Sequence, residues 1–237
     1  MFKNGLIFFL TTLVCFNSLA SSTEPKKSNL YLKMIATVSN ISDIQSVDKE
    51  LNFNLSHESS LSPAIGVGFG YYINDKVRVD LMFEHLKFNF SEQSASFDYS
   101  DADALFVGTR SVKRVTSGKS LMLNGFVDFV DRNSFKLFVG AGVGGVRLKE
   151  KINHAFSGNA ITANHTYTFP LLTEGSTSKV TTQFAHSLML GTSIQVKPQL
   201  NIELMYSWKN FGKVKHDELM KNQYKGHHFS IATRFDL

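Results

Sequence analysis

Cysteine is almost absent from this chain of 237 residues, which has a single one, Cys15, inside an apolar N-terminal stretch. If that stretch is removed on export, the mature chain has no cysteine, which excludes disulfides, a thiolate nucleophile and cysteine-ligated zinc. No later run reaches the roughly 18 apolar residues of a helical membrane span. A strong charge is missing too, since the formal net charge is only +5 and the basic residues are scattered. We therefore expect no nucleic-acid partner.

The N-terminus has the three parts of a secretory signal peptide. Lys3 precedes a mostly apolar stretch, residues 6–16, and Ser18-Leu19-Ala20 provides small residues at the cleavage site. A membrane anchor is the alternative, but the apolar stretch is short for a span of about 20 residues. We predict a cleaved signal at 1–20 and one domain at 21–237. An exported chain without a spanning helix is periplasmic, secreted or an outer-membrane barrel.

Alternation of apolar and polar residues with period two dominates the mature chain and predicts strands. The alternating segments are 30–38, 64–73, 76–90, 120–130, 135–144, 183–196, 200–209 and 228–237. In the third segment the apolar phase changes after Phe83 to Leu86, Phe88 and Phe90, which suggests a bulge near His85. The pattern predicts an all-β fold, an up-and-down antiparallel transmembrane barrel of eight strands.

The connections between these segments alternate in length. Tight turns are expected at 74–75, 131–134 and 197–199, and long polar loops at about 39–62, 91–118, 149–181 and 211–224. Short turns at one end and long loops at the other are typical of an outer-membrane barrel with periplasmic turns and extracellular loops. The even strand number places both termini at the periplasmic end.

One face of the strands is apolar and the other carries charges of both signs. A lipocalin-like soluble barrel would place the apolar face inside, whereas a membrane barrel places the charges in its lumen as ion pairs. The expected lumen network is Lys33, Arg78, Asp80, Glu84, Asp128, Lys136, Glu203 and Arg234. Aromatic residues near strand ends, expected to form girdles at the lipid interfaces, are Tyr71, Tyr206, Trp208 and Phe235. These girdles favour the membrane barrel, with lipid outside.

Three stretches, residues 66–84, 136–148 and 184–212, resemble the opacity-protein-like, porin-superfamily surface antigens of Gram-negative bacteria. Those proteins are barrels similar to the transmembrane domain of outer membrane protein A. The resemblance implies an outer-membrane location, with outer-membrane lipid and lipopolysaccharide and the barrel-assembly machinery as partners. The chain departs from the family at its last residue, where Leu237 replaces the usual terminal Phe.

Gly140, Gly142 and Gly145 match the spacing of a dinucleotide-binding fingerprint. That site needs a following helix and an acid about 20 residues on, and neither is present, so we expect no cofactor. The inward glycines Gly140, Gly142 and Gly144 instead provide space in a narrow lumen, and Gly145 is expected to mark where the strand leaves the membrane.

A histidine, a serine and an acid, as His228, Ser230 and Glu203 provide, serve some lipid A-modifying hydrolases. Those residues act on the lipid side, whereas this alternation places all three inside. We interpret His228 and Ser230 as polar lumen residues and expect no enzyme activity. The other histidines lack ligand spacing, so no metal site is expected either.

The leading functional hypothesis is a surface antigen or adhesin whose four loops contact host-surface proteins. Lys213, Lys215 and Lys221 in the last loop are candidate contacts, although they also fit an ordinary solvated loop. A narrow channel for small solutes is the second hypothesis, and a lipid A-modifying hydrolase is the third.

Overall fold

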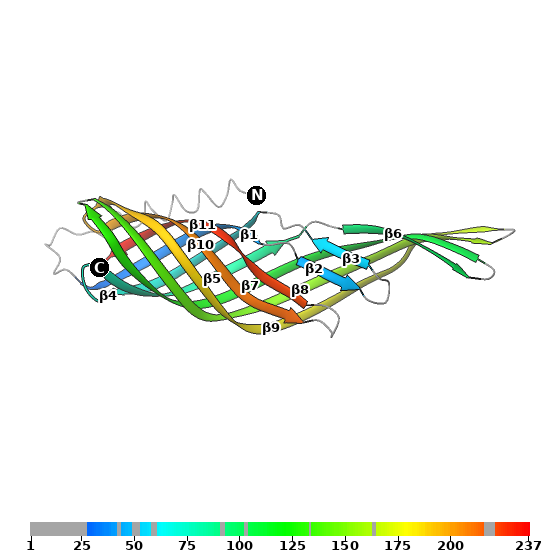
Figure 1. The fold of residues 1–237 in the computed structure, drawn as a ribbon, viewed down its shortest axis with the longest axis horizontal. Helices are drawn as coiled ribbons and strands as arrows, with labels where there is room; N and C mark the ends of the chain where they lie inside the picture. Colours follow the sequence, from blue (N-terminus) through cyan, green and yellow to red (C-terminus); the bar gives the residue numbers. More distant parts are fainter. Residues whose placement is uncertain are drawn as a thin grey trace.

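Eight strands close into an antiparallel barrel in the computed structural model, which describes residues 28–41, 44–48, 53–57, 61–90, 93–101, 104–132, 134–162, 165–215 and 221–237 (Figure 1). The strands are β1 Leu30–Ile41, β2 Ile44–Asp48, β3 Phe53–His57, β4 Ser62–Tyr72, β5 Val77–Asn89, β6 Gln93–Asp101, β7 Ala104–Arg132, β8 Phe135–Thr162, β9 Thr166–Lys197, β10 Leu200–Lys215 and β11 Lys221–Asp236. The ring runs β1-β4-β5-β7-β8-β9-β10-β11 and closes between β11 and β1. The predicted barrel is confirmed, while the predicted signal peptide lies outside the described residues.

Three strands are far longer than a membrane crossing requires. β7, β8 and β9 have 29, 28 and 32 residues, whereas a tilted membrane strand needs about 9–11. The loops predicted at 91–118 and 149–181 are therefore wrong in large part, because pairing continues through most of them. We call this extension the arm: β6 with residues 104–118 of β7, 147–162 of β8 and 166–182 of β9. Figure 1 shows it projecting beyond the ends of β10 and β11.

The bulge predicted near His85 is wrong. β5 pairs in unbroken register with both β4 and β7 past this residue. Leu86 and Phe88 are each only 1% exposed and continue the inward face of Glu84. The inward face changes from polar to apolar at this level, which mimics a change of phase in the sequence. A register shift lies instead in β10 at Gly212, whose φ of 82° suits glycine.

The barrel is apolar outside and charged inside. Ile65, Phe69 and Phe184 are 65–68% exposed on the outer wall, whereas Arg78 and Glu203 in the interior are 0% exposed. A wall of this kind is stable in lipid and would aggregate in water, so the soluble-barrel alternative is disfavoured. No helix in the described part of the chain is long and apolar enough to cross a membrane.

Inward glycines leave space for large side chains on the neighbouring strands. A Cβ atom added at Gly140 would come 2.5 Å from Cδ1 of Phe126, and the Phe126 ring packs edge-on against Phe138 with centroids 5.5 Å apart. The long loop expected after Gly145 is wrong, since β8 continues to Thr162. Gly145 pairs with Leu121, the last exposed apolar residue on the outward face of β7 before Lys119, so the apolar wall does end at its level. Gly145 faces outward at a point where the sheet simply goes on.

Substitution of Gly140 by alanine is expected to lower the free energy of unfolding by about 1–3 kcal/mol, because the Phe126 ring must move out of its site. Urea unfolding in lipid vesicles, followed by the heat-sensitive gel shift of folded barrels, measures this change. The matched control is Gly125→Ala on the adjacent strand, where an added Cβ meets no atom within 4 Å. Equal effects of the two substitutions would refute the packing explanation.

Candidate functional site

Glu203 lies at the centre of an ion-pair network in the lumen. Its carboxylate accepts hydrogen bonds from the guanidinium groups of Arg78, at 2.8 Å, and Arg234. Lys33 Nζ lies 2.9 Å from the other carboxylate oxygen. The four residues come from β1, β5, β10 and β11 and are all fully or nearly fully buried. One carboxylate therefore pairs with three cations from three other strands, which leaves an excess of positive charge.

Two aspartates neutralise the excess positive charge around Glu203. Asp80 lies 3.4 Å from Lys33 Nζ and accepts a 2.7 Å hydrogen bond from Asn124. Asp128 lies 3.7 Å from both Arg78 and Lys136. Lys136 is at the rim, with 26% of its side chain exposed, and pairs at 2.9 Å with the more exposed Asp131.

Aromatic rings enclose the cations of this network. The Arg78 guanidinium lies 4.6 Å from the ring centre of Phe126 and 4.7 Å from that of Phe138. Arg234 lies 5.6 and 5.5 Å from the rings of Tyr31 and Tyr72. Cation–π contacts of this kind are stronger where water is excluded. The rings fill the cross-section between the charges and leave little room for a solute.

The last predicted network residue, Glu84, lies at a separate level further from the turn end. Lys209 Nζ is 2.7 Å from both of its carboxylate oxygens. A further pair, Arg114 and Glu150, joins β7 and β8 at 2.8 Å where loops were predicted. The sequence reasoning missed this pair, although the inward alternation of Arg114, Thr116 and Gly118 continues that of Ser120.

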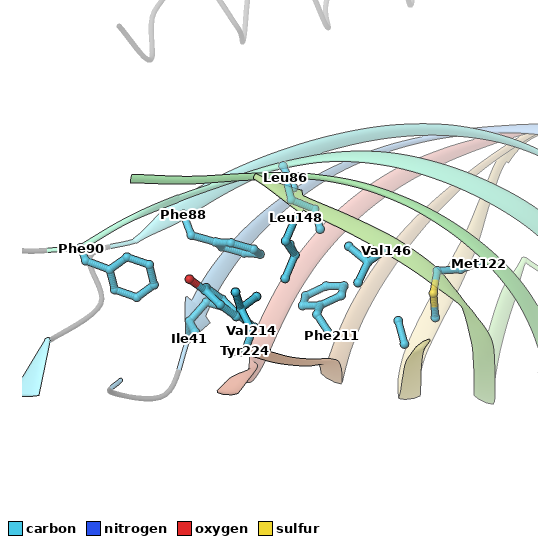
Figure 2. Packing of buried hydrophobic residues seen from close by; sticks show 12 residues of the cluster. Ile41, Leu86, Phe88, Phe90, Met122, Val146, Leu148, Phe211, Val214 and Tyr224 are labelled. Atoms are coloured by element: carbon cyan, nitrogen blue, oxygen red, sulfur yellow. The ribbon is translucent and has the colours of Figure 1, made fainter. Parts of the chain in front are cut away.

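An apolar layer, here called the plug, crosses the lumen between the Glu84–Lys209 pair and the Arg114–Glu150 pair. Its side chains converge from several strands toward the barrel axis (Figure 2). The Phe88 ring centre lies 5.9 Å from those of both Phe211 and Tyr224, and the Phe90 and Tyr224 ring centres are 6.1 Å apart. The plug comprises Ile41, Ala64, Leu86, Phe88, Phe90, Met122, Val146, Leu148, Ala185, Phe211, Val214 and Tyr224.

Tyr224 gives the plug a polar edge on the side of the arm. Its hydroxyl shares a 2.9 Å hydrogen bond with that of Thr116. Burial raises the pKa of the Tyr224 phenol, which lies beyond the membrane-spanning part of β11, so this group stays neutral. The phenol can thus end an apolar layer without adding a buried charge.

A cavity of about 10 Å³ lies between the central network and the plug. Lys33, Glu84, Asn124, Ser187 and Lys209 supply its polar lining. This volume holds about one water molecule. The described lumen is thus filled by side chains, as expected for a barrel of eight strands.

The hydrolase-like residues do not form a catalytic arrangement. His228 Nδ1 is 2.6 Å from Ser39 Oγ, and Ser230 Oγ is 2.8 Å from Thr37 Oγ1. Glu203 is held by the network described above. His228 and Ser230 are both buried below the plug, away from lipid.

The four predicted girdle aromatics all lie on the outer wall, at its two ends. Tyr71 and Phe235 are the second-last residues of β4 and β11, near the turns. Tyr206 and Trp208 are nearer the arm end, where the Tyr206 hydroxyl lies 2.6 Å from His227 Nδ1 and Trp208 packs beside His186, with ring centres 5.7 Å apart. The apolar outer wall thus has aromatic residues at both rims.

Of the three candidate loop lysines, the structure describes the side chain of Lys213 alone, and it is exposed. Lys215 and Lys221 belong to the paired ends of β10 and β11, and their side chains lie outside the described ones. The stretch predicted as a loop from 211 is therefore partly strand.

The arm projects beyond the ends of β10 and β11 and exposes apolar side chains at its tip (Figure 1). On one face of its tip, Leu105 lies directly opposite Ile161 in the β7–β8 register, and both are 40% exposed. Val107, two residues along β7, is 41% exposed on the same face. These three residues form what we call the tip patch. Among the described residues, β6 pairs with β7 alone, so its other edge is open.

A closed antiparallel barrel with an apolar wall, aromatic rims and a charged interior is the architecture of an outer-membrane β-barrel protein. The chain belongs to the family described as "Outer membrane protein beta-barrel domain", whose model matches residues 6–234. Its turns are then periplasmic and its arm extracellular.

Named relatives come from Rickettsia. A "Putative adhesin" of Rickettsia conorii is 35% identical and covers 93% of this chain and 86% of its own length. A "Putative adhesin" of Rickettsia canadensis is 27% identical, covering 99% of this chain and 100% of its own. Among solved structures, Neisserial surface protein A is 16% identical, with a TM-score of 0.43 over 90% of this chain and 100% of its own.

Proposed function

We propose that this protein is a surface adhesin that binds a host-surface protein through its extracellular arm, with the barrel as membrane anchor. The observation that carries the proposal is the arm itself, in which β7 to β9 continue as paired strands beyond the membrane. The adhesin names of the relatives support it. At about 3.4 Å per residue, the roughly 15 residues of β7 in the arm extend about 50 Å along the strand.

The tip patch suits protein recognition because it is apolar, exposed and held on a paired sheet. Leu105, Val107 and Ile161 need no rearrangement to be reached, so little conformational entropy is lost on binding. The open edge of β6 beside it can pair with an extended segment of a partner by strand addition.

The double substitution Leu105→Ser and Ile161→Ser is expected to weaken binding of the purified, folded protein to host cells about tenfold or more, the effect typical of a hot spot. Val180→Ser is the matched control, since Val180 is 48% exposed on the arm but far along β9 from the tip. Retention of the heat-sensitive gel shift shows that each variant is folded. Full binding by the double variant would rule out the tip patch as the contact.

The remaining two hypotheses receive less support from the lumen. A channel would need a water-filled path, whereas the central network and the plug fill the described interior. A lipid A hydrolase would need its His, Ser and acid to face lipid, whereas His228, Ser230 and Glu203 face inward. We therefore propose a role without transport or catalysis.

A further inference from the structure

β6 has an amphipathic sequence, although it lies outside the membrane-spanning part of the barrel. From Ser94 to Ser100, one set of alternate positions holds Ala95, Phe97 and Tyr99, and the other holds only serine and aspartate. Alternation of this kind predicts a strand that is buried on one face and solvated on the other. The apolar face of β6 therefore calls for a surface that covers it.

The register places aromatic residues from all four strands of the arm on one face. Closer to the barrel this face carries Val112 and Ile152, each 4% exposed, and it continues the lumen side of the wall. Toward the tip it holds six aromatic residues, here called the aromatic face: Phe97, Tyr99, Phe106, Phe156, Tyr167 and Phe169. The tip patch lies on the opposite face, because successive residues of a strand alternate between the two faces.

The aromatic face is accessible in a single copy at Tyr167, which is 54% exposed. Figure 1 shows that β2 and β3 end short of the tip along the long axis of the molecule. Six aromatic residues can bury about 900–1,500 Å² per copy, whereas a standard protein interface buries about 800 Å² per partner. The aromatic face is thus large enough for a stable contact with another protein surface.

The arm also has an open edge on each side. In the described part of the chain, β6 pairs with β7 alone, and residues 173–182 of β9 pair with β8 alone. Pro170, which cannot donate a hydrogen bond to a partner strand, lies outside that segment. β6 runs toward the tip and β9 runs away from it. Because all copies in one membrane point the same way, β6 of one copy and β9 of another would be antiparallel, whereas two β6 or two β9 edges would be parallel.

We propose that two copies pair through their arms in the outer membrane, with β6 of each copy against β9 of the other. A two-fold axis along the membrane normal forms both edge pairs at once. The eight arm strands then close into a second barrel with both aromatic faces inside, and an interior of this size is filled by side chains. The tip patches stay outside, so the dimer goes beyond the proposed adhesin function and does not depend on it.

The stagger of the strands brings the two edges to the same height. Asp128 donates its backbone N–H to Lys76 of β5. Followed around the ring, the row of paired residues that starts at Asp128 reaches β5 again at residue 86 instead of 76, ten residues further on, after Phe138, Gly191, Met205, Ser230, Thr37 and Ala64. A dimeric barrel with the same stagger gains half of it, about five residues, over four strands. The row of Ser178 crosses the arm through Lys151 and Val115 to Asn89, so Ser178 of one copy would lie close to Ser94 of the other.

The test uses cysteines placed on separate copies, which is practical because the only cysteine, Cys15, lies in the predicted signal peptide. Differently tagged Ser94→Cys and Ser178→Cys variants are produced in the same cells, and their outer membranes are treated with a short bismaleimide. We expect a cross-linked dimer that carries both tags, and no dimer when either variant is produced alone. In the control, Asn159→Cys on the central strand β8 replaces Ser94→Cys and should give no product above background.

The aromatic face is tested in the same assay. Phe97→Ser/Tyr167→Ser is expected to lower the cross-linked fraction about tenfold or more, because it removes aromatic residues from the centre of the contact. Leu105→Ser/Ile161→Ser, on the opposite face, should leave the fraction unchanged, and the heat-sensitive gel shift shows that every variant is folded. The proposal fails if no dimer carries both tags, if either cysteine variant cross-links to itself, or if the aromatic variant cross-links as well as the unaltered arm.

Discussion

Glu203→Gln is expected to lower the free energy of unfolding by about 3–5 kcal/mol, the cost of removing one partner from a buried ion-pair network. The amide would be neutral, so Lys33, Arg78 and Arg234 would remain close together in the lumen with their main counter-charge lost. Urea titration in lipid vesicles measures the change.

The control for this experiment is Asp131→Asn, which removes the same charge from an exposed ion pair with Lys136. Pairs of this kind contribute about 0–1 kcal/mol, so this variant should unfold close to the wild type. If Glu203→Gln were equally mild, the network would contribute little to stability, and the central role given to Glu203 would be wrong.

Phe88→Ala is expected to destabilise the barrel by about 3–5 kcal/mol, because the substitution removes a ring from the centre of the plug and leaves a cavity. The ring packs between Phe211 and Tyr224, and its side chain is almost completely buried. Phe88→Leu keeps much of the volume and should lose less than half as much. A smaller loss for alanine than for leucine would contradict packing as the cause.

The plug also leads to an expected result for the wild type in planar bilayers, which is the absence of conductance steps. Phe88→Ala should remain silent as well, because the Glu203 network still crosses the lumen on the periplasmic side. Steps in the wild-type recordings would restore the channel hypothesis.

The barrel and the direction of its side chains could be predicted from the sequence because period-two alternation is strongest where one face meets lipid. Leu121 and Leu123 alternate with Ser120, Asn124 and other polar residues, and the structure places them accordingly. That signal depends on the contrast between lipid and lumen. It weakens wherever the surroundings of the two faces become similar.

Two features escaped prediction because this contrast changes along the strands. At the plug the inward face of β5 becomes apolar while the outward residues His85 and Lys87 are polar, so Leu86 and Phe88 imitate a change of register. In the arm both faces are largely polar, so the stretches around Arg114 and Glu150 read as loops. Arg114 on β7 and Glu150 on β8 pair with each other, and a contact between residues 36 positions apart cannot be inferred from local spacing.

Because β7, β8 and β9 run without interruption from the tip to the periplasmic side, the arm has mechanical consequences for a bacterium held by its surface. A pulling force on the tip acts along the strands, while the hydrogen bonds between antiparallel strands lie perpendicular to them. Many hydrogen bonds between the strands therefore resist the force together in shear. A flexible loop has no such paired strands, so the hydrogen bonds at its base would be loaded one after another. Tension at the contact would be carried into the wall of the barrel rather than into a hinge.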